Sequence, residues 1–176
     1  MVVNLRLNEC VRMTTKIVLH GKKSMAQWSE ESRKSGNVTF TSCNLDNQPF
    51  HLMFEDVKIP FEPSQFGGDG TEIRRSICFS GASDEMRKQL ASMEESIGAT
   101  SSSIKDEIIR CKINMDKVRC FDDNRKLIDA PKTWRGWNAN VQVHIRGKWV
   151  TRQSSGLCIE VTDIQLIEAR EAPCPF

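Results

Sequence analysis

Two long stretches in the second half of the chain alternate between apolar and polar residues, the pattern of half-buried β-strands. These stretches are Asn140–Val150 and Leu157–Leu166. In the second, the apolar positions shift phase by one residue, which predicts a β-bulge near Thr162 and Asp163. Turn-forming residues at 151–156 separate the two stretches. We therefore expect the two strands to form a hairpin.

Shorter alternating or apolar stretches predict further strands. They are Lys16–His20, Val38–Cys43, Phe50–Val57, Glu72–Ser80, Ile109–Met115 and Lys117–Phe121. The turn-forming residues at 46–49 predict that the second and third of these strands pair. The polar, Ser-rich stretch Gly21–Asn37 is expected to form a loop or a short frayed helix. Two prolines and three glycines in Lys58–Thr71 predict an irregular, packed loop.

One stretch has the pattern of an amphipathic helix, at about 83–97. Ser83 is a favourable N-cap, acidic residues follow it in the first turn, and Gly98 is a natural stop. The apolar residues that share one helical face are Met86, Leu90, Met93 and Ile97. A stripe at this spacing predicts a helix packed on a core.

The order of strands, one helix and more strands predicts a mainly β fold. We expect an OB-fold, a five-stranded Greek-key barrel with extra strands and one packed α-helix. At 176 residues, the chain is expected to form a single OB-fold domain over 1–168, followed by a short extended tail over 169–176.

The net charge of +2 conceals an uneven distribution. Residues 110–152 carry eleven Lys and Arg against four Asp, whereas residues 153–176 carry one Arg against four acids. A basic block within a mildly acidic chain indicates a polyanionic partner. A solvated strand face rich in lysine is the alternative explanation.

Seven cysteines without close pairing are typical of reduced thiols, so we expect an intracellular, reducing compartment. No apolar run approaches the roughly 18 residues that cross a membrane, and the N-terminus lacks the apolar core of a secretory signal. No membrane association is therefore expected.

No residue pattern indicates a cofactor, a metal or a catalytic centre. The three histidines lie in no zinc-binding frame, and the glycines at 67–70 lack the Lys-Ser/Thr ending of a phosphate-binding loop. Acidic residues at Asp122, Asp123 and around Asp69 leave a metal-dependent nuclease as an alternative. Acidic residues in turns are the commoner explanation.

Tryptophans and basic residues alternate in two places, as a surface that binds single-stranded nucleic acid requires. Bases stack on aromatic rings, while Lys and Arg neutralise phosphates. The expected stacking residues are Trp134, Trp137 and Trp149, and the expected phosphate contacts are Arg74, Arg75, Lys112, Lys132, Arg135, Arg146 and Lys148. The alternative is that the tryptophans anchor the core or its loops.

The closing half of the chain resembles a known family. Its features, in order, are a strand, the run Phe121-Asp122-Asp123-Asn124-Arg125-Lys126, then Ala130-Pro131, a Gly-containing turn, and two alternating strands of which Gly156 opens the last. The stretch ends with Val161, Ile164, Leu166, Ile167 and Glu168. This order resembles the phage T7-type single-stranded-DNA-binding proteins, in the version found in large nucleocytoplasmic DNA viruses of eukaryotes. The preceding strand and helix fit the same order.

The resemblance implies a non-enzymatic protein that coats and protects single strands in DNA replication, recombination or repair. It places the protein in the nucleus or at a cytoplasmic viral replication site of an infected cell. Relatives end in a long acidic tail with a terminal aromatic residue that recruits replication proteins. This chain keeps the terminal Phe176 but has few acids before it. Recruitment through the tail is therefore in doubt.

Three functions follow from the sequence, and the first is preferred: single-stranded DNA binding with little sequence preference. The others are a metal-dependent nuclease and an OB barrel that binds a protein partner through its tryptophans. The preference for DNA over RNA, and whether the protein forms a homodimer, are left open.

Overall fold

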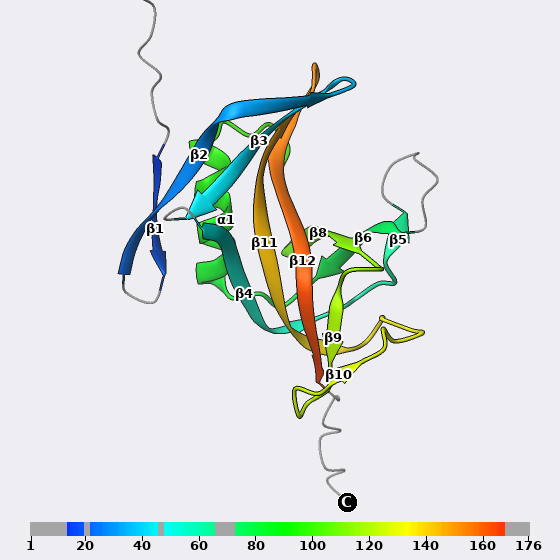
Figure 1. Ribbon diagram of the computed structural model, residues 1–176. Helices are drawn as coiled ribbons and strands as arrows, with labels where there is room; N and C mark the ends of the chain where they lie inside the picture. Colours follow the sequence, from blue (N-terminus) through cyan, green and yellow to red (C-terminus); the bar gives the residue numbers. More distant parts are fainter. Residues whose placement is uncertain (1–13, 20–21, 46–47, 66–72, 168–176) are drawn as a thin grey trace, which may run out of the picture.

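The computed structural model describes residues 14–19, 22–45, 48–65 and 73–167, and most of these lie in one twisted sheet (Figure 1). The elements in chain order are β1 (Thr14–Leu19), β2 (Lys22–Ser35), β3 (Val38–Leu45), β4 (Gln48–Lys58), β5 (Ser64–Gln65), β6 (Arg74–Phe79), α1 (Asp84–Ser96), β7 (Ile104–Lys105), β8 (Ile108–Asn114), β9 (Arg119–Phe121), β10 (Leu127–Ile128), β11 (Asn138–Val150) and β12 (Ser155–Ile167). The mainly β fold expected from the sequence is confirmed.

Five of these strands close into a barrel. Neighbouring strands pair in the order β4, β11, β12, β8 and β6. The ring closes where Lys58, at the end of β4, and Ser80, just after β6, exchange two backbone hydrogen bonds of 2.9 Å. All neighbours are antiparallel except β8 and β12, which are parallel. A five-stranded barrel that closes through so short a contact is the partly open barrel of the OB type.

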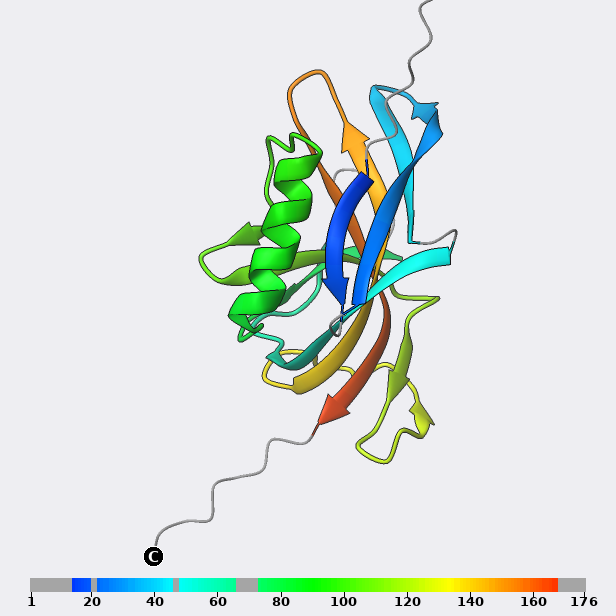
Figure 2. The ribbon, with the colours of Figure 1, turned by 90° about the vertical axis from the view of Figure 1, so that its left-hand side faces the viewer.

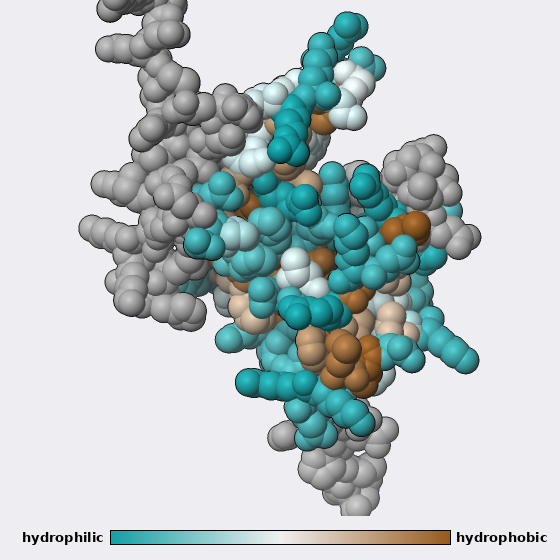
Figure 3. Space-filling view, viewed as in Figure 1, coloured by the Kyte–Doolittle hydropathy of each residue, from teal (hydrophilic) through white to brown (hydrophobic). Residues whose placement is uncertain are grey.

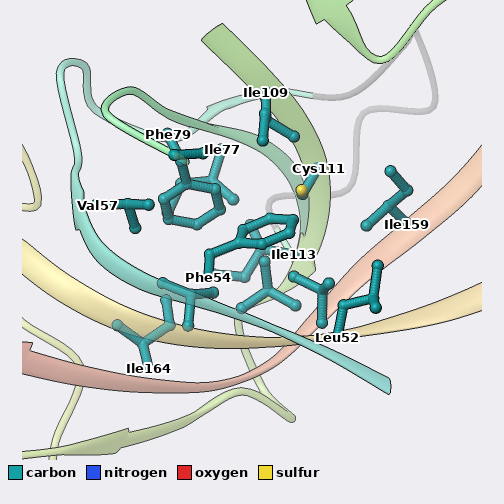
Figure 4. Packing of buried hydrophobic residues seen from close by; sticks show 14 of the residues in the cluster. Leu52, Phe54, Val57, Ile77, Phe79, Ile109, Cys111, Ile113, Ile159 and Ile164 are labelled. Atoms are coloured by element: carbon teal, nitrogen blue, oxygen red, sulfur yellow. The ribbon is translucent and has the colours of Figure 1, made fainter. Parts of the chain in front are cut away.

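Alternation along the barrel strands places their apolar residues inside. Phe50, Leu52 and Phe54 of β4 are all buried on this inner face. The Phe54 and Phe79 rings meet edge to face, with centroids 6.1 Å apart. Figure 4 shows these rings among aliphatic side chains from β6, β8 and β12. Because each of the five strands contributes inward residues, the barrel has one continuous core.

The helix α1 lies alongside the strands (Figure 2). The Ser83 hydroxyl accepts a hydrogen bond from the Met86 amide at the start of the helix, and Gly98 adopts a φ of 60° just beyond its end. The helix therefore begins at the expected N-cap, Ser83, and ends before the expected stop, Gly98. Leu90, Met93 and Ile97 are buried in the barrel core, so the predicted stripe is the packed face.

The long hairpin of β11 and β12 contains two bulges. Gln142 pairs with Asp163 and Val143 pairs with Val161, so Thr162 is the extra residue. This bulge agrees with the phase shift seen in the sequence. A second register shift lies between Ile145 and Gly147 and leaves Arg146 as an extra residue of β11. The second bulge was not predicted.

The expected loop or frayed helix at Gly21–Asn37 is wrong, because most of this stretch is the strand β2. Its backbone pairs with β1 on one side and β3 on the other, which stabilises a strand without an apolar period. The strands β2 and β3 therefore form a ribbon, which we call the appended ribbon, outside the five-stranded barrel (Figure 1).

The predicted pairing of β3 with β4 is confirmed only where β3 ends and β4 begins, at Asn44 with Pro49 and Leu45 with Gln48. Beyond it the two strands diverge to different parts of β11. From Asn138 to Ile145, β11 pairs with β4. From Gly147 to Val150 it pairs with β3, so the appended ribbon continues from the end of the barrel hairpin.

Candidate nucleic-acid interface

A basic groove of about 370 Å³ crosses the outer face of β6, β8 and β12. It is lined by Phe40, Arg74, Arg75, Lys112, Ile113, Asn114, Lys117, Arg146, Cys158 and Glu160. Five of these ten residues are Lys or Arg, and one is acidic. In Figure 3 the surface over these strands is mostly hydrophilic, with smaller apolar areas. We call this surface the basic groove.

Strand pairing places the cations of β6 and β8 side by side. Arg74 lies opposite Asn114 and Ser76 lies opposite Lys112, and directly opposed residues share a face of the sheet. The Asn114 side chain accepts a hydrogen bond from the Asp116 amide, which forms the turn that leads to Lys117. The pairing of β6 with β8 therefore places Arg74 and Lys112 on the same face of the two strands.

Arg146 enters the groove because of the second bulge. As the extra residue of β11, it interrupts the alternation that would otherwise continue from Ile145 to Gly147. Its guanidinium Nη1 lies 2.7 Å from Oε2 of Glu160, and 49% of the Arg146 side chain stays exposed. Arg146 can therefore reach a second anion while it contacts Glu160.

The surroundings of the groove also shift the pKa values of two neutral groups. Burial raises the pKa of the Cys158 thiol, partly opposed by the nearby Lys112. The pKa of His144, which pairs with Glu160 across the strands, is lowered by burial and by the neighbouring His51 and Arg146. Neutral forms of both groups are thus favoured beside the cations.

Four of the predicted phosphate contacts converge in this groove. They are Arg74, Arg75, Lys112 and Arg146. Lys117 and Phe40 were not singled out from the sequence, yet both line the groove. The basic block at 110–152 contains Lys117, so its position was signalled by charge, whereas nothing in the sequence marked Phe40.

The predicted residues between Pro131 and Trp137 lie elsewhere. Trp134 is 3% exposed and belongs to the core, so its ring has no open face on which a base could stack. The Trp137 indole donates a hydrogen bond to the Thr133 carbonyl, and its ring packs partly against the core. The exposed Lys132 and Arg135 do not line the groove. This segment fits the alternative explanation of tryptophans as anchors.

A carboxylate holds that segment in place. Glu62 accepts hydrogen bonds of 3.0–3.1 Å from the backbone amides of Trp134 and Arg135. Next to these contacts, the Gly136 amide donates a hydrogen bond of 2.8 Å to the Ile59 carbonyl. The arrangement connects two loops, and it gives Glu62 a structural partner.

The remaining pair of predicted residues, Lys148 and Trp149, also makes structural contacts. The Lys148 ammonium donates to the Ile97 carbonyl at the end of α1, at 2.7 Å. The Trp149 indole donates to the Leu157 carbonyl, at 3.1 Å, and its ring is half-buried. Phe176 lies outside the described residues.

Two other cavities are less suited to a polyanion. One of about 730 Å³ lies between β4 and the start of α1, and its lining contains Glu55 and Glu85 but no Lys or Arg. Another of about 430 Å³ contains Arg119 and Arg125, which are offset by Glu55 and Asp163. Only the basic groove combines a cavity with a large excess of positive charge among these three.

The acidic residues considered for a nuclease are placed as follows. The Asp122 carboxylate accepts hydrogen bonds from the Asn124 and Lys126 amides, which is the geometry of a structural turn. Asp69 lies outside the described residues. Within the described ranges, no three His, Cys, Asp or Glu side chains are grouped as metal ligands. The described helix is too short and too polar to span a membrane.

The barrel and its groove define the class of this protein as an OB-type barrel with a cationic outer face. No family model and no curated protein matches the sequence. Among solved structures, the chain is similar to a C-terminally truncated single-stranded DNA-binding protein from bacteriophage Enc34. Identity is 12%, the TM-score is 0.49, and 81% of this chain and 98% of that chain are covered.

A second solved structure is the bacteriophage Enc34 single-stranded DNA-binding protein in complex with single-stranded DNA. Here the identity is 13% and the TM-score 0.46, with 83% of this chain and 100% of that chain covered. Neither likeness assigns a ligand to this chain.

Proposed function

We propose that this protein binds single-stranded DNA in the basic groove, with little sequence preference and without catalysis. The observation that carries the proposal is the convergence of five cations from three separate segments on one groove. OB barrels bind oligonucleotides on the face of their second and third strands. In this barrel β6 and β8 hold those positions, and both contribute cations to the groove.

The spacing of charge in the groove suits a flexible polyanion. Phosphates of a single strand are neutralised by Lys and Arg that follow its backbone, and this contribution does not depend on base identity. The described lining of the groove offers few amide side chains for reading base edges, since Asn114 is the one Asn or Gln in it and already holds a turn. Low sequence preference follows from this composition.

We propose that the protein coats and protects single strands in replication, recombination or repair inside an infected cell, as a viral protein in a reducing compartment. The sequence resemblance to the phage T7-type family and its relatives in large DNA viruses supports this role. RNA as a second ligand, a homodimer, and recruitment of replication proteins through Phe176 are open extensions of the same proposal.

The decisive experiment measures anisotropy of a labelled oligothymidylate at several salt concentrations. If all five groove cations neutralise phosphates, log K against log salt should have a slope of about −3.5, since each contributes roughly 0.7 on single strands. A response that is flat in salt, or an absence of binding at low salt, would overturn the proposal. Incubation of the same strand with Mg²⁺ separates the nuclease alternative, because a binding protein leaves the strand intact.

A further inference from the structure

The basic groove does not end at the barrel. Phe40, which lines it, belongs to β3 of the appended ribbon rather than to one of the five barrel strands. Among the described residues that line the groove, it is the only aromatic one. Its position outside the barrel shows that the ribbon forms one wall of the groove.

Cross-strand pairing extends this wall outward. Phe40 lies opposite Trp149 of β11 on one side and opposite Arg33 of β2 on the other. Directly opposed residues project from the same face of a sheet, so Arg33 lies one strand further from the barrel on the face that carries Phe40. Arg33 is exposed, and Phe40 is half-buried.

The tip of the Phe40 ring lies close to Gly147, the residue that follows Arg146, where two backbones approach each other. Gly147 faces Ser42 in the pairing of β11 with β3, and a Cβ at Gly147 would come within 3.0 Å of the Phe40 Cζ atom. Arg146 precedes Gly147 and also lines the groove. An aromatic ring next to a guanidinium is the combination that holds a base and its phosphate in single-strand sites.

We propose that a single strand leaves the basic groove across the appended ribbon, where Phe40 stacks on a base and Arg33 neutralises a neighbouring phosphate. This inference rests on the proposed function and adds to it a stacking residue and a direction for the strand. The ribbon is then part of the binding site and not merely an addition to the sheet. Its role moves the stacking surface away from the tryptophan-rich segment at 131–137.

Salt dependence distinguishes the two parts of the proposal. Phe40→Leu should weaken binding of oligothymidylate about 5- to 150-fold while it leaves the salt slope unchanged, because stacking releases no counterions. Phe40→Tyr, which keeps the ring, should bind as the unaltered protein does. Arg33 would be a sixth phosphate contact, so the unaltered protein should have a salt slope of about −4.2 and Arg33→Gln should return it to about −3.5.

Phe61→Ala is the matched control, since Phe61 is 53% exposed and does not line the groove. It should leave binding unchanged, and thermal unfolding should verify that each variant is folded. The inference is overturned if the unaltered protein binds with the expected salt slope but Phe40→Leu and Arg33→Gln bind equally well. If the unaltered protein does not bind at all, the proposed function fails instead.

Discussion

A Cβ atom at Gly147 would lie 2.0 Å from the backbone carbonyl oxygen of Thr41, so the strands β11 and β3 approach each other in a way that only glycine permits. Gly147 also has a φ of 153°, which L side chains rarely adopt. The contact joins the appended ribbon to the barrel hairpin at the level of the basic groove. A substitution at Gly147 therefore tests directly how the appended ribbon is attached to the barrel.

Gly147→Ala should destabilise the protein by at least about 2 kcal/mol, since backbone must move to admit the methyl group. Urea unfolding followed by circular dichroism measures this loss. Gly136→Ala is the control, because Gly136 also has a positive φ, of 94°, but nothing lies within 4 Å of its Cβ position. Equal losses in the two variants would contradict the steric explanation.

Charge removal inside the groove should weaken binding in a salt-dependent way. Lys112→Gln and Arg74→Gln should each lower the magnitude of the salt slope by about 0.7. Arg110→Gln is the matched control, because Arg110 lies on β8, as Lys112 does, but does not line the groove. The measurement is oligothymidylate affinity over a range of salt concentrations. A control variant that loses as much slope as the groove variants would show that the overall charge, not the groove, governs binding.

Glu160→Gln should tighten binding. The carboxylate contacts Arg146 at 2.7 Å and is the one acid among the described lining residues of the groove, so its neutralisation frees the guanidinium for phosphate and removes a repulsion. A surface ion pair is worth about 0.2–1 kcal/mol, which corresponds to a gain of about 1.5- to 5-fold in affinity. Asp163→Asn serves as the control, since it breaks the Arg119 ion pair outside the groove. Weaker binding by Glu160→Gln would mean that Glu160 positions Arg146 for phosphate.

The stability of the protein should decrease as the pH falls below about 6.5, in part because of His144. Its pKa in the folded protein is lowered from 6.5, chiefly by burial. The unfolded chain therefore binds a proton more readily, and protonation favours unfolding. His144→Gln should flatten the dependence of the urea midpoint on pH in this range. An identical pH profile for the variant and the unaltered protein would exclude this role.

Four cysteines should resist alkylation until the protein unfolds. Burial raises the pKa of Cys43 to about 12 and that of Cys120 to about 11, and it raises the pKa values of Cys111 and Cys158 as well. Because the thiolate is the reactive form, iodoacetamide should label them slowly at neutral pH. The half-buried Cys78 should be labelled before these four. Peptide mass spectrometry with and without urea measures the order, and early labelling of Cys111 would contradict it.

The barrel strands and the helix were predictable from the sequence because their side chains alternate between core and solvent. The phase shift near Thr162 even located a bulge. The strand β2 was missed since it is held by backbone pairing on both sides and has no apolar period to signal it. Local patterns thus identify elements that bury one face, and miss elements that mainly complete a sheet.

The candidate site was only partly predictable. Charge identified Arg74, Lys112 and Arg146, but proximity in the sequence suggested a tryptophan cluster that the fold does not use in the groove. Trp134 is buried instead, since a large ring stabilises a loop as readily as it binds a base. The position of Phe40 in the groove depends on the pairing of β3 with β11, which joins residues more than a hundred positions apart, so the sequence could not show it.

Arg146 is the residue at which β11 changes partners, from β4 through Ile145 to β3 from Gly147 onward. As a bulge residue, Arg146 is paired with no residue of β3, β4 or β12. Replacing its side chain therefore disturbs neither register nor core. Variation at this position removes at most the surface ion pair with Glu160, worth about 0.2–1 kcal/mol, so the affinity for a polyanion can evolve with little change in folding.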